Sequence, residues 1–410
     1  MPPSRRHDKS VYVRRRIAVV AILAVLVGIG TYSGIALTRP VPAAAAALSV
    51  PATVSNPAVP LAWPQSGHNG AIGAIGFDGV LADYGPQETT PMASITKTVT
   101  ALVTLEAKPI AAGDTGPGIP LTVADQRIYQ QVIAEGGSAA PVVPGAVFTQ
   151  RQILEAMMLP SANNYSITLV NWAFGSMDAY LEAARAWLAE HGLNGTTIAD
   201  SSGLNPGSAS TPADLVTIGK LVLQNPVLKE IVAEQQAELP VIGTVHNTNL
   251  LLGQDGVIGL KTGTTDIAGA CLLFAAELPV GASTVTVVGV VLGAPNHRVL
   301  AEEVTALLGT VGQAFHEVTP VAAGQDFGSY SSVWGDSASV VARESATVIT
   351  WQDQPVTVKA TADAIASGTD GEQVGTATIS YNGGQQSVPL TLNGTIAEPD
   401  PFWRLTNPVG

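Results

Sequence analysis

The chain has 410 residues, of which 46% are hydrophobic and 12% are charged, and its formal net charge is −13. This length allows two or three domains with a large core, and an acidic balance without a basic patch argues against a nucleic-acid partner. The single cysteine, Cys271, excludes an internal disulfide and is expected to be a small buried apolar group. No HExxH motif, Cys/His cluster, P-loop or dinucleotide fingerprint occurs, so we expect neither a metal nor a cofactor.

The N-terminus combines a basic tail with a long apolar run. Residues 1–16 carry six Lys and Arg against one Asp, and residues 17–38 carry no charge. A run of this length can span a bilayer, and the basic flank predicts a cytoplasmic tail with the body of the chain outside the membrane. The alternative is a signal peptide, cleaved in the small-residue stretch 42–47, with secretion of the rest. The run exceeds the usual signal-peptide length, which favours a retained anchor, and the Pro-rich stretch 39–64 predicts an extracytoplasmic linker.

A serine and a lysine stand at the start of the first predicted helix, 94–107, which follows two opening strands at 71–79 and 80–84. Ser94 and Lys97 are three residues apart, so both side chains lie on one face of that helix. A serine hydroxyl needs an adjacent base to become a nucleophile, and burial near a helix N-terminus favours a neutral lysine and a stabilised oxyanion. The spacing predicts this pair; an N-cap serine beside a solvated lysine is the structural alternative.

Ser161 and Asn163 follow the end of a second well-marked helix. Thr149 and Gln152 form a capping-box pattern at its start, and a proline ends it. This stop leaves the two polar side chains on a turn, where a hydroxyl can relay a proton and an amide can orient a lysine or a substrate. The alternative is an N-cap for a further helix over 164–173.

Lys261, Thr262 and Gly263 lie in a strand predicted over 257–265. A strand edge offers backbone groups to an extended peptide, the lysine adds a cation for a carboxylate, and the glycine permits close approach. An exposed hairpin edge with an ordinary lysine is the alternative. Only seven lysines occur in the chain and two of them fall in these motifs, which favours the functional interpretation.

The order of the elements predicts an α+β fold. Helices are expected throughout 94–230, followed by strands at 239–245, 257–265, 270–277 and 283–292 and by a closing helix at 298–315. This order indicates an antiparallel sheet flanked by helices, forming a catalytic domain over 65–320. A small all-β domain over 321–410 is expected from strands at 340–351, 356–360, 373–381 and 387–392, with a hairpin turn at 382–384.

The three motifs occur in the order Ser94–Lys97, Ser161–Asn163 and Lys261–Gly263, 67 and 100 residues apart. In this order they resemble the low-molecular-mass penicillin-binding proteins, specifically the serine-type D-alanyl-D-alanine carboxypeptidases, over 71–318. Further segments that fit the family are Pro91–Thr98, Asp200–Leu204, Thr211–Leu215 and His246–Leu251. The resemblance implies the penicillin-binding/β-lactamase-like transpeptidase fold and removal of the terminal D-alanine from peptidoglycan stem pentapeptides.

The resemblance also implies catalytic roles. Ser94 would be the acylated nucleophile, Lys97 its general base, and Ser161 the group that passes a proton to the departing D-alanine. The backbone N–H groups of Ser94 and Thr264 would form the oxyanion hole. Thr264 replaces a histidine that is common after the third motif, a departure that leaves the substrate preference open.

The same resemblance implies a substrate-binding set. Lys261 and Thr262 would hold the terminal carboxylate of the substrate, while Asn163 and Gly263 would line the site. Ala162 stands where many relatives carry glycine. The partners would be the peptidoglycan stem peptide, β-lactam antibiotics as covalent inhibitors, and the membrane through the N-terminal helix.

Three alternatives remain. An endopeptidase or transpeptidase would use the same acyl-enzyme, because water or an amine can attack it. A class A β-lactamase would need a glutamate, and Glu190–Asn194 matches its E-x-x-L-N pattern, but the helix predicted over 180–189 places Glu190 in a solvated last turn. A catalytically silent cell-wall binding protein would be expected to lose Ser94 or Lys97, and both are present.

Overall fold

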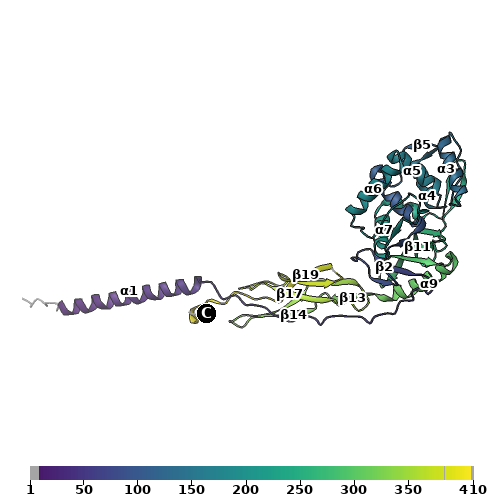
Figure 1. Ribbon diagram of the computed structural model, residues 1–410. Coiled ribbons are helices and arrows are strands. Elements are labelled where there is room, and N and C mark those ends of the chain that lie inside the picture. Colours follow the sequence, from purple (N-terminus) through teal and green to yellow (C-terminus); the bar gives the residue numbers. More distant parts are fainter. Residues whose placement is uncertain (1–8, 383, 408–410) are drawn as a thin grey trace, which may run out of the picture. The chain divides into compact units, whose positions relative to one another are not determined.

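The computed structural model describes residues 9–382 and 384–407, which form two compact units (Figure 1). The α+β unit consists of residues 55–317 and 349–354, and the β unit consists of residues up to 54, 318–348 and those from 355 onward. Parts of three expected features lie outside the described residues: positions 1–8 of the basic tail, 383 of the hairpin turn, and 408–410 of the all-β domain.

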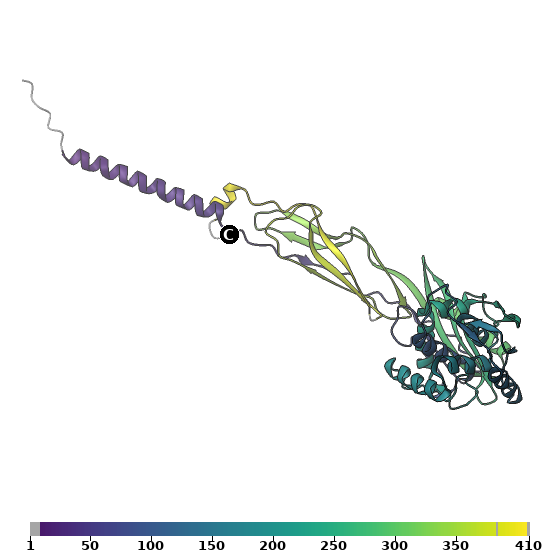
Figure 2. The same ribbon diagram turned by 90° about the horizontal axis from the view of Figure 1, so that it is seen from above.

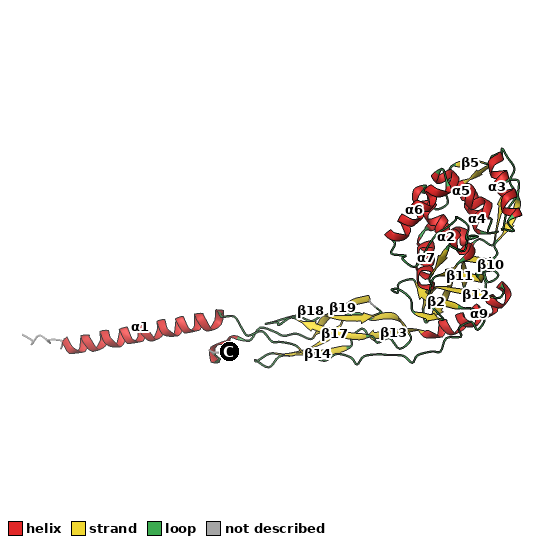
Figure 3. Cartoon of the chain, in the orientation of Figure 1, coloured by secondary structure: helices red, strands yellow, loops and turns green. Residues whose placement is uncertain are grey.

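A five-stranded antiparallel sheet with the order β10-β11-β12-β2-β3 is the centre of the α+β unit (Figure 3). Its strands are β10 Val257–Thr265, β11 Gly269–Val280, β12 Ser283–Ala294, β2 Asn69–Ala74 and β3 Ala82–Tyr84. Short two-stranded pairs surround it: β4 Thr90–Pro91 with β7 Ala209–Ser210, and β5 Gly118–Pro120 with β6 Val147–Thr149. The predicted antiparallel sheet flanked by helices is therefore confirmed.

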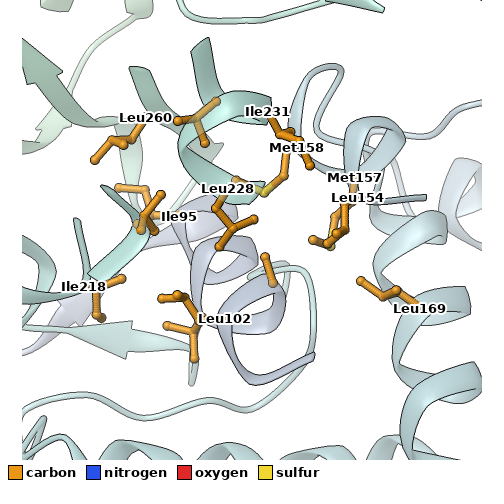
Figure 4. Packing of buried hydrophobic residues seen from close by; sticks show 14 of the residues in the cluster. Ile95, Leu102, Leu154, Met157, Met158, Leu169, Ile218, Leu228, Ile231 and Leu260 are labelled. Atoms are coloured by element: carbon orange, nitrogen blue, oxygen red, sulfur yellow. The ribbon is translucent and has the colours of Figure 1, made fainter. Parts of the chain in front are cut away.

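Helices cover both faces of this sheet. Leu273 and Val288 belong to a core shared with six helices, whereas Leu272 and Val287, one residue away on the same strands, belong to a second core with α9. This division follows from the alternation of side chains along a strand. Figure 4 shows the first core, where apolar side chains of several helices meet. The helices of the unit are α2 Thr96–Ala107, α3 Val123–Ala134, α4 Gln150–Met158, α5 Asn163–Phe174, α6 Met177–Glu190, α7 Pro212–Gln224, α8 Pro226–Ala233 and α9 His297–Ala314.

The prediction of a single strand over 239–245 is wrong. The chain forms a hairpin there, with β8 Gln236–Leu239 paired to β9 Gly243–His246. Val241 in the turn has a φ of 57°. β-Branched residues rarely adopt this conformation, so the apolar pattern gave no sign of the turn.

A six-stranded antiparallel sheet with the order β1-β14-β15-β19-β18-β17 forms the β unit, whose long strands run side by side in Figure 2. Its strands are β1 Ala47–Leu48, β14 Asp326–Ser331, β15 Ser337–Ala342, β19 Gly384–Asn393, β18 Gln373–Tyr381 and β17 Thr357–Ala362. Two further strands, β13 Phe315–Val321 and β16 Ala346–Trp351, pair with each other. The expected strand 340–351 is thus divided between β15 and β16, and the expected all-β region is present.

The stretch 39–64 is more ordered than the expected linker. β1 lies within it and pairs with β14, and Ala44 forms a bridge with Ile365. The β unit therefore takes sheet residues from both sides of the α+β unit along the chain.

The apolar N-terminal run forms α1 Lys9–Thr38, which is long and apolar enough to cross a membrane. Its C-terminal part contacts the short helix α10 Pro401–Thr406. In this contact the Tyr32 hydroxyl donates a hydrogen bond to the Leu405 carbonyl at 2.5 Å. Both helices belong to the β unit.

Candidate active site

Ser94 and Lys97 lie at the junction of a short 3-10 helix, Ala93–Ile95, and α2. The Lys97 Nζ atom is 2.8 Å from Ser94 Oγ. Ile95 is fully buried and fixes the turn in the core. Ala93 has a φ of 47°, a strained left-handed conformation for a residue with a side chain. Such strain is common at functional sites, and here it orients the serine that follows.

Lys97 is completely buried, and its side-chain nitrogen has three hydrogen-bond partners. Besides Ser94, its Nζ atom donates to Asn163 Oδ1 at 2.7 Å and to the Ser202 carbonyl at 3.0 Å. Burial, followed by the charge of Lys261, holds the pKa of Lys97 well below its ordinary value, and Asp200 opposes this shift. The ammonium form is therefore disfavoured, as a general base requires.

Ser161 lies in the turn between α4 and α5, and Asn163 is the first residue of α5. The predicted capping box of Thr149 and Gln152 starts α4 and is confirmed. Ser161 has a φ of 63°, is 6% exposed, and its Oγ atom has no hydrogen-bond partner among the described residues. The side chain that precedes α5 is Ala162, which makes no cap hydrogen bond. Asn163 therefore contacts Lys97, and Ser161 does not cap α5.

The third motif divides between the two faces of β10. Lys261 and Gly263 pair with Leu273 and Cys271 on β11, while Thr262, one residue away, faces the opposite side of the sheet. Cys271 is buried in the core, as expected. Lys261 is 1% exposed, and its burial lowers its pKa to about 7.

Gly263 brings β10 against the nucleophile. A Cβ atom at this position would lie 2.9 Å from the Ser94 backbone nitrogen and 3.1 Å from the Met92 carbonyl oxygen. Only glycine permits this approach without displacing backbone atoms. The structure therefore brings the predicted residues of the first and third motifs together, and Lys97 joins them to the second.

Asp200 has no role among the predicted site residues, but it organises the loop that carries the Ser202 carbonyl. Its Oδ1 atom accepts from the Gly203 N–H at 2.9 Å, and its Oδ2 atom accepts from the Ser202 hydroxyl at 2.7 Å and the Leu204 N–H at 3.0 Å. An aspartate three residues before a glycine, as in Asp200 and Gly203, is a turn signal that could have revealed this.

A second missed group supports Thr262 and Thr264. The hydroxyls of Thr248 and Thr262 are 2.6 Å apart, and His297 Nε2 is 2.6 Å from Thr264 Oγ1. Neither contact has a local sequence signal, because each joins residues from different elements.

An open pocket of about 450 Å³ begins beside Lys97's two carbonyl partners. Its lining consists of Val132, Glu135, Asn163, Ile167, Asp200, Ser202, Leu204, Asn205 and Pro206. The pocket shares Asn163 and Ser202 with the surroundings of Lys97, while Ser94 itself is partly exposed. By contrast, Glu190 is the exposed last residue of α6, as expected.

The family model described as D-alanyl-D-alanine carboxypeptidase matches residues 77–296, so the chain belongs to this family of serine peptidases. It is 28% identical over 268 residues to the D-alanyl-D-alanine carboxypeptidase DacC of Escherichia coli, covering 64% of this chain and 65% of the relative. A D-alanyl-D-alanine carboxypeptidase of Mycobacterium tuberculosis is 33% identical over 196 residues, covering 46% and 63%. The chain thus spans just under two thirds of the length of these relatives.

Solved structures show the same fold. Penicillin binding protein 5 from Haemophilus influenzae superposes with a TM-score of 0.58 at 19% identity, over 82% of this chain and 99% of that one. A variant of the Streptomyces K15 DD-transpeptidase superposes with a TM-score of 0.55 at 25% identity, over 61% and 98%. The penicillin-binding fold class expected from the sequence is confirmed.

Proposed function

We propose that the protein is a penicillin-sensitive serine D-Ala-D-Ala carboxypeptidase that removes the terminal D-alanine of peptidoglycan stem pentapeptides. The observation that carries the proposal is the contact between Lys97 Nζ and Ser94 Oγ, in a site where burial lowers the pKa of the lysine and favours its neutral form. Family membership and the names of the relatives support the substrate class.

Acylation follows from the positions of these groups. Neutral Lys97 takes the hydroxyl proton of Ser94 as Oγ attacks the carbonyl carbon of the penultimate D-alanine. The N–H groups of Ser94 and Thr264 stabilise the oxyanion. The proton then passes through the Ser161 hydroxyl to the amine of the leaving D-alanine, the C–N bond breaks, and an ester to Ser94 remains. Water attacks this ester with Lys97 as base, and the stem tetrapeptide leaves.

Substrate binding uses the third motif. Lys261 and Thr262 would hold the terminal carboxylate, which must be partly desolvated, while Gly263 lets the substrate backbone lie along β10. The pKa of about 7 places Lys261 near half-protonation at neutral pH before substrate binds, and an arriving carboxylate favours the charged form. Asn163 would hold Lys97 in place and line the pocket.

Intact mass spectrometry with benzylpenicillin tests the proposal. We expect one covalent adduct, mapped to the peptide that contains Ser94 and absent from Ser94→Ala. Labelling at another residue, or no labelling of a folded protein, would refute the proposed nucleophile.

A transpeptidase activity is the second candidate, because the structural relative from Streptomyces K15 is described as a DD-transpeptidase. It would share the acyl-enzyme and differ in the acceptor. Adding glycine or D-alanine as an amine acceptor to a D-Ala-D-Ala peptide and measuring exchange against hydrolysis distinguishes the two activities. The comparisons do not favour a β-lactamase or a silent binding protein, and the exposed position of Glu190 agrees with this.

We further propose that α1 is retained as a membrane anchor, with residues 1–16 in the cytoplasm, 17–38 in the bilayer and the chain from residue 39 onward outside. Cleavage near 42–47 would remove residues that the β unit uses, since Ala44 and Ala47 pair with Ile365 and Ser329. N-terminal sequencing of the native protein decides this: a start near Leu48 would show a cleaved signal peptide and a secreted enzyme.

A further inference from the structure

His297 is the first residue of α9 and reaches the end of β10 from outside the three motifs. Its Nε2 atom lies 2.6 Å from Thr264 Oγ1. Two contacts hold the start of the helix in place: the Asn296 side chain accepts from the Val299 N–H at 3.0 Å, and Leu300 is buried in the core beneath the sheet. The imidazole is therefore presented from a rigid element.

Thr262 and Thr264 share one face of β10, opposite Leu272 and Ala270 on β11. Each of these threonines forms a hydrogen bond with a side chain from another segment of the chain. Thr248 holds the hydroxyl of Thr262, and His297 holds that of Thr264. A small cavity lined by Asn249, Thr262, Leu272 and His297 joins the two contacts. Thr264 is itself exposed, so a substrate lying along β10 can touch it.

We infer that His297 is a positioning residue for the reaction, which acts through Thr264 to fix the end of β10 against the substrate. This inference rests on the proposed function and extends it to a residue outside the three motifs. The structure places an imidazole from α9 against the hydroxyl of Thr264, at the end of the strand that carries the third motif. With Thr264 held, its backbone N–H keeps a fixed direction toward the developing oxyanion.

The charges around His297 favour a role as a neutral hydrogen-bond partner. Burial, and then the charge of Lys261, lower the pKa of His297 below its ordinary value. The neighbouring Arg298 points its charge elsewhere, in an exposed ion pair with Glu302 at 2.8 Å. At neutral pH the imidazole is uncharged. Either Nε2 donates a hydrogen bond to the Thr264 hydroxyl, or the hydroxyl donates one to Nε2.

Four variants of the full-length protein test the inference: His297→Ala, His297→Gln, Thr264→Val, and the Ala/Val double variant. His246→Ala is the matched control, because His246 is an exposed histidine on β9 in the same unit. The measurements are kcat/KM on a D-Ala-D-Ala peptide, the rate of Ser94 labelling by benzylpenicillin, and Tm. Gln can place an amide near the position of Nε2, so it should restore the bond.

We expect His297→Ala to lower both rates by roughly 3- to 10-fold, the range of one hydrogen bond. His297→Gln should recover most of this, His246→Ala should change nothing, and His297→Ala should add little in the Thr264→Val background. Equal effects of His297→Ala in both backgrounds, or no effect in the wild type, would overturn the inference. A wild-type protein that neither labels nor cleaves would instead refute the proposed function.

Discussion

The side-chain nitrogen of Lys97 lies 2.8 Å from the Oγ atom of Ser94, and its two other partners, Asn163 Oδ1 and the Ser202 carbonyl, accept hydrogen bonds but cannot donate them through these atoms. A neutral amine has two N–H groups and one lone pair. When the two carbonyl oxygens take the N–H groups, the lone pair is left for the serine hydroxyl. The geometry thus selects the direction in which the lysine can remove a proton.

The first prediction concerns pH. The pKa of Lys97 is lowered by burial and that of Lys261 is lowered to about 7, so the two lysines should produce a bell-shaped profile of kcat/KM. Activity falls at low pH as Lys97 gains a proton, and falls above about pH 7 as Lys261 loses the charge that binds the carboxylate. A substrate with an amidated C-terminus should lack the alkaline limb. An alkaline limb of equal size for both substrates would contradict the assignment to Lys261.

The second prediction concerns substrate coupling. Lys261→Met should lower kcat/KM on the free-acid substrate by roughly 10- to 100-fold, because a charge-assisted hydrogen bond contributes about 1.5–3 kcal/mol. The amidated substrate should already be poor and should lose little more. Steady-state kinetics of two enzymes on two substrates gives the coupling directly. Equal losses on both substrates would show that this lysine does not bind the carboxylate.

The third prediction is that Lys261→Met also raises stability. The folded pKa of about 7 lies below the unfolded value of roughly 10.4, so burial of the charged form destabilises the fold below pH 7, and this penalty disappears as pH rises toward 10. Calorimetry should show a Tm gain of several degrees at pH 6 that shrinks by pH 9.5, since about 1 kcal/mol shifts Tm by ~2–4 °C in a domain of this size.

Lys220→Met is the control for that measurement. The Lys220 ammonium donates to the carbonyls of Phe77 and Gly79 at 2.8 and 3.0 Å, so its removal leaves two acceptors without a donor. We expect its Tm to fall. A higher Tm for both variants would show that the added apolar side chain, and not removal of the Lys261 charge, causes the effect.

The fourth prediction tests the contact of β10 with the nucleophile. Gly263→Ala places a Cβ atom 2.9 Å from the Ser94 nitrogen, so it must displace the N–H group that we propose as an oxyanion donor. The rate of penicillin labelling should fall by roughly 10-fold or more, short of the 10²–10³ that full loss of a donor costs. Gly309→Ala on α9 is the matched control, because nothing lies within 4 Å of a Cβ there and alanine favours a helix. Wild-type labelling by Gly263→Ala would refute the proposed oxyanion site.

The fifth prediction concerns Asp200. Its charge raises the pKa of Lys97, so Asp200→Asn should move the acid limb of kcat/KM to lower pH. It should also lower kcat, because the Ser202 loop loses acceptors. Asp214→Asn is the control: Asp214 accepts from Gly195 and Thr196 at 2.9 and 2.8 Å in the same unit, without a contact to the base. An acid limb that stays in place, or that moves equally in both variants, would exclude the electrostatic role.

Local patterns were sufficient to predict much of the fold. The capping box at Thr149 predicted the start of α4, and the continuous apolar runs predicted β10, β11 and β12, because both faces of the sheet are covered by helices. The hairpin at Val241 and the strands β1, β13 and β14 were missed. The hairpin was missed because Val241 adopts a left-handed conformation that β-branched residues rarely take. β1 was missed because its partner β14 lies far along the chain, as Ala47 pairs with Ser329, and local propensity carries no record of such a partner.

The candidate site shows the same division. The sequence predicts Ser94, Lys97 and the third motif, because the residues of each motif lie within four positions of one another. Asp200 and His297 were not assigned roles, since each acts on a residue far along the chain: Asp200 through the Ser202 carbonyl on Lys97, and His297 on Thr264. Only the packing of α9 and the loop of residues 200–205 against the rest of the unit brings them into contact.

The pairing of β1 with β14 has a consequence for the order of folding. Ala47 lies opposite Ser329, so the first strand of the β unit has no partner until most of the chain has been made. Most of the α+β unit, residues 55–317, lies between these two strands in the sequence, and its contacts become available earlier. We expect it to fold first, with the β unit closing last because its long-range pairing must pay the larger loop-closure entropy.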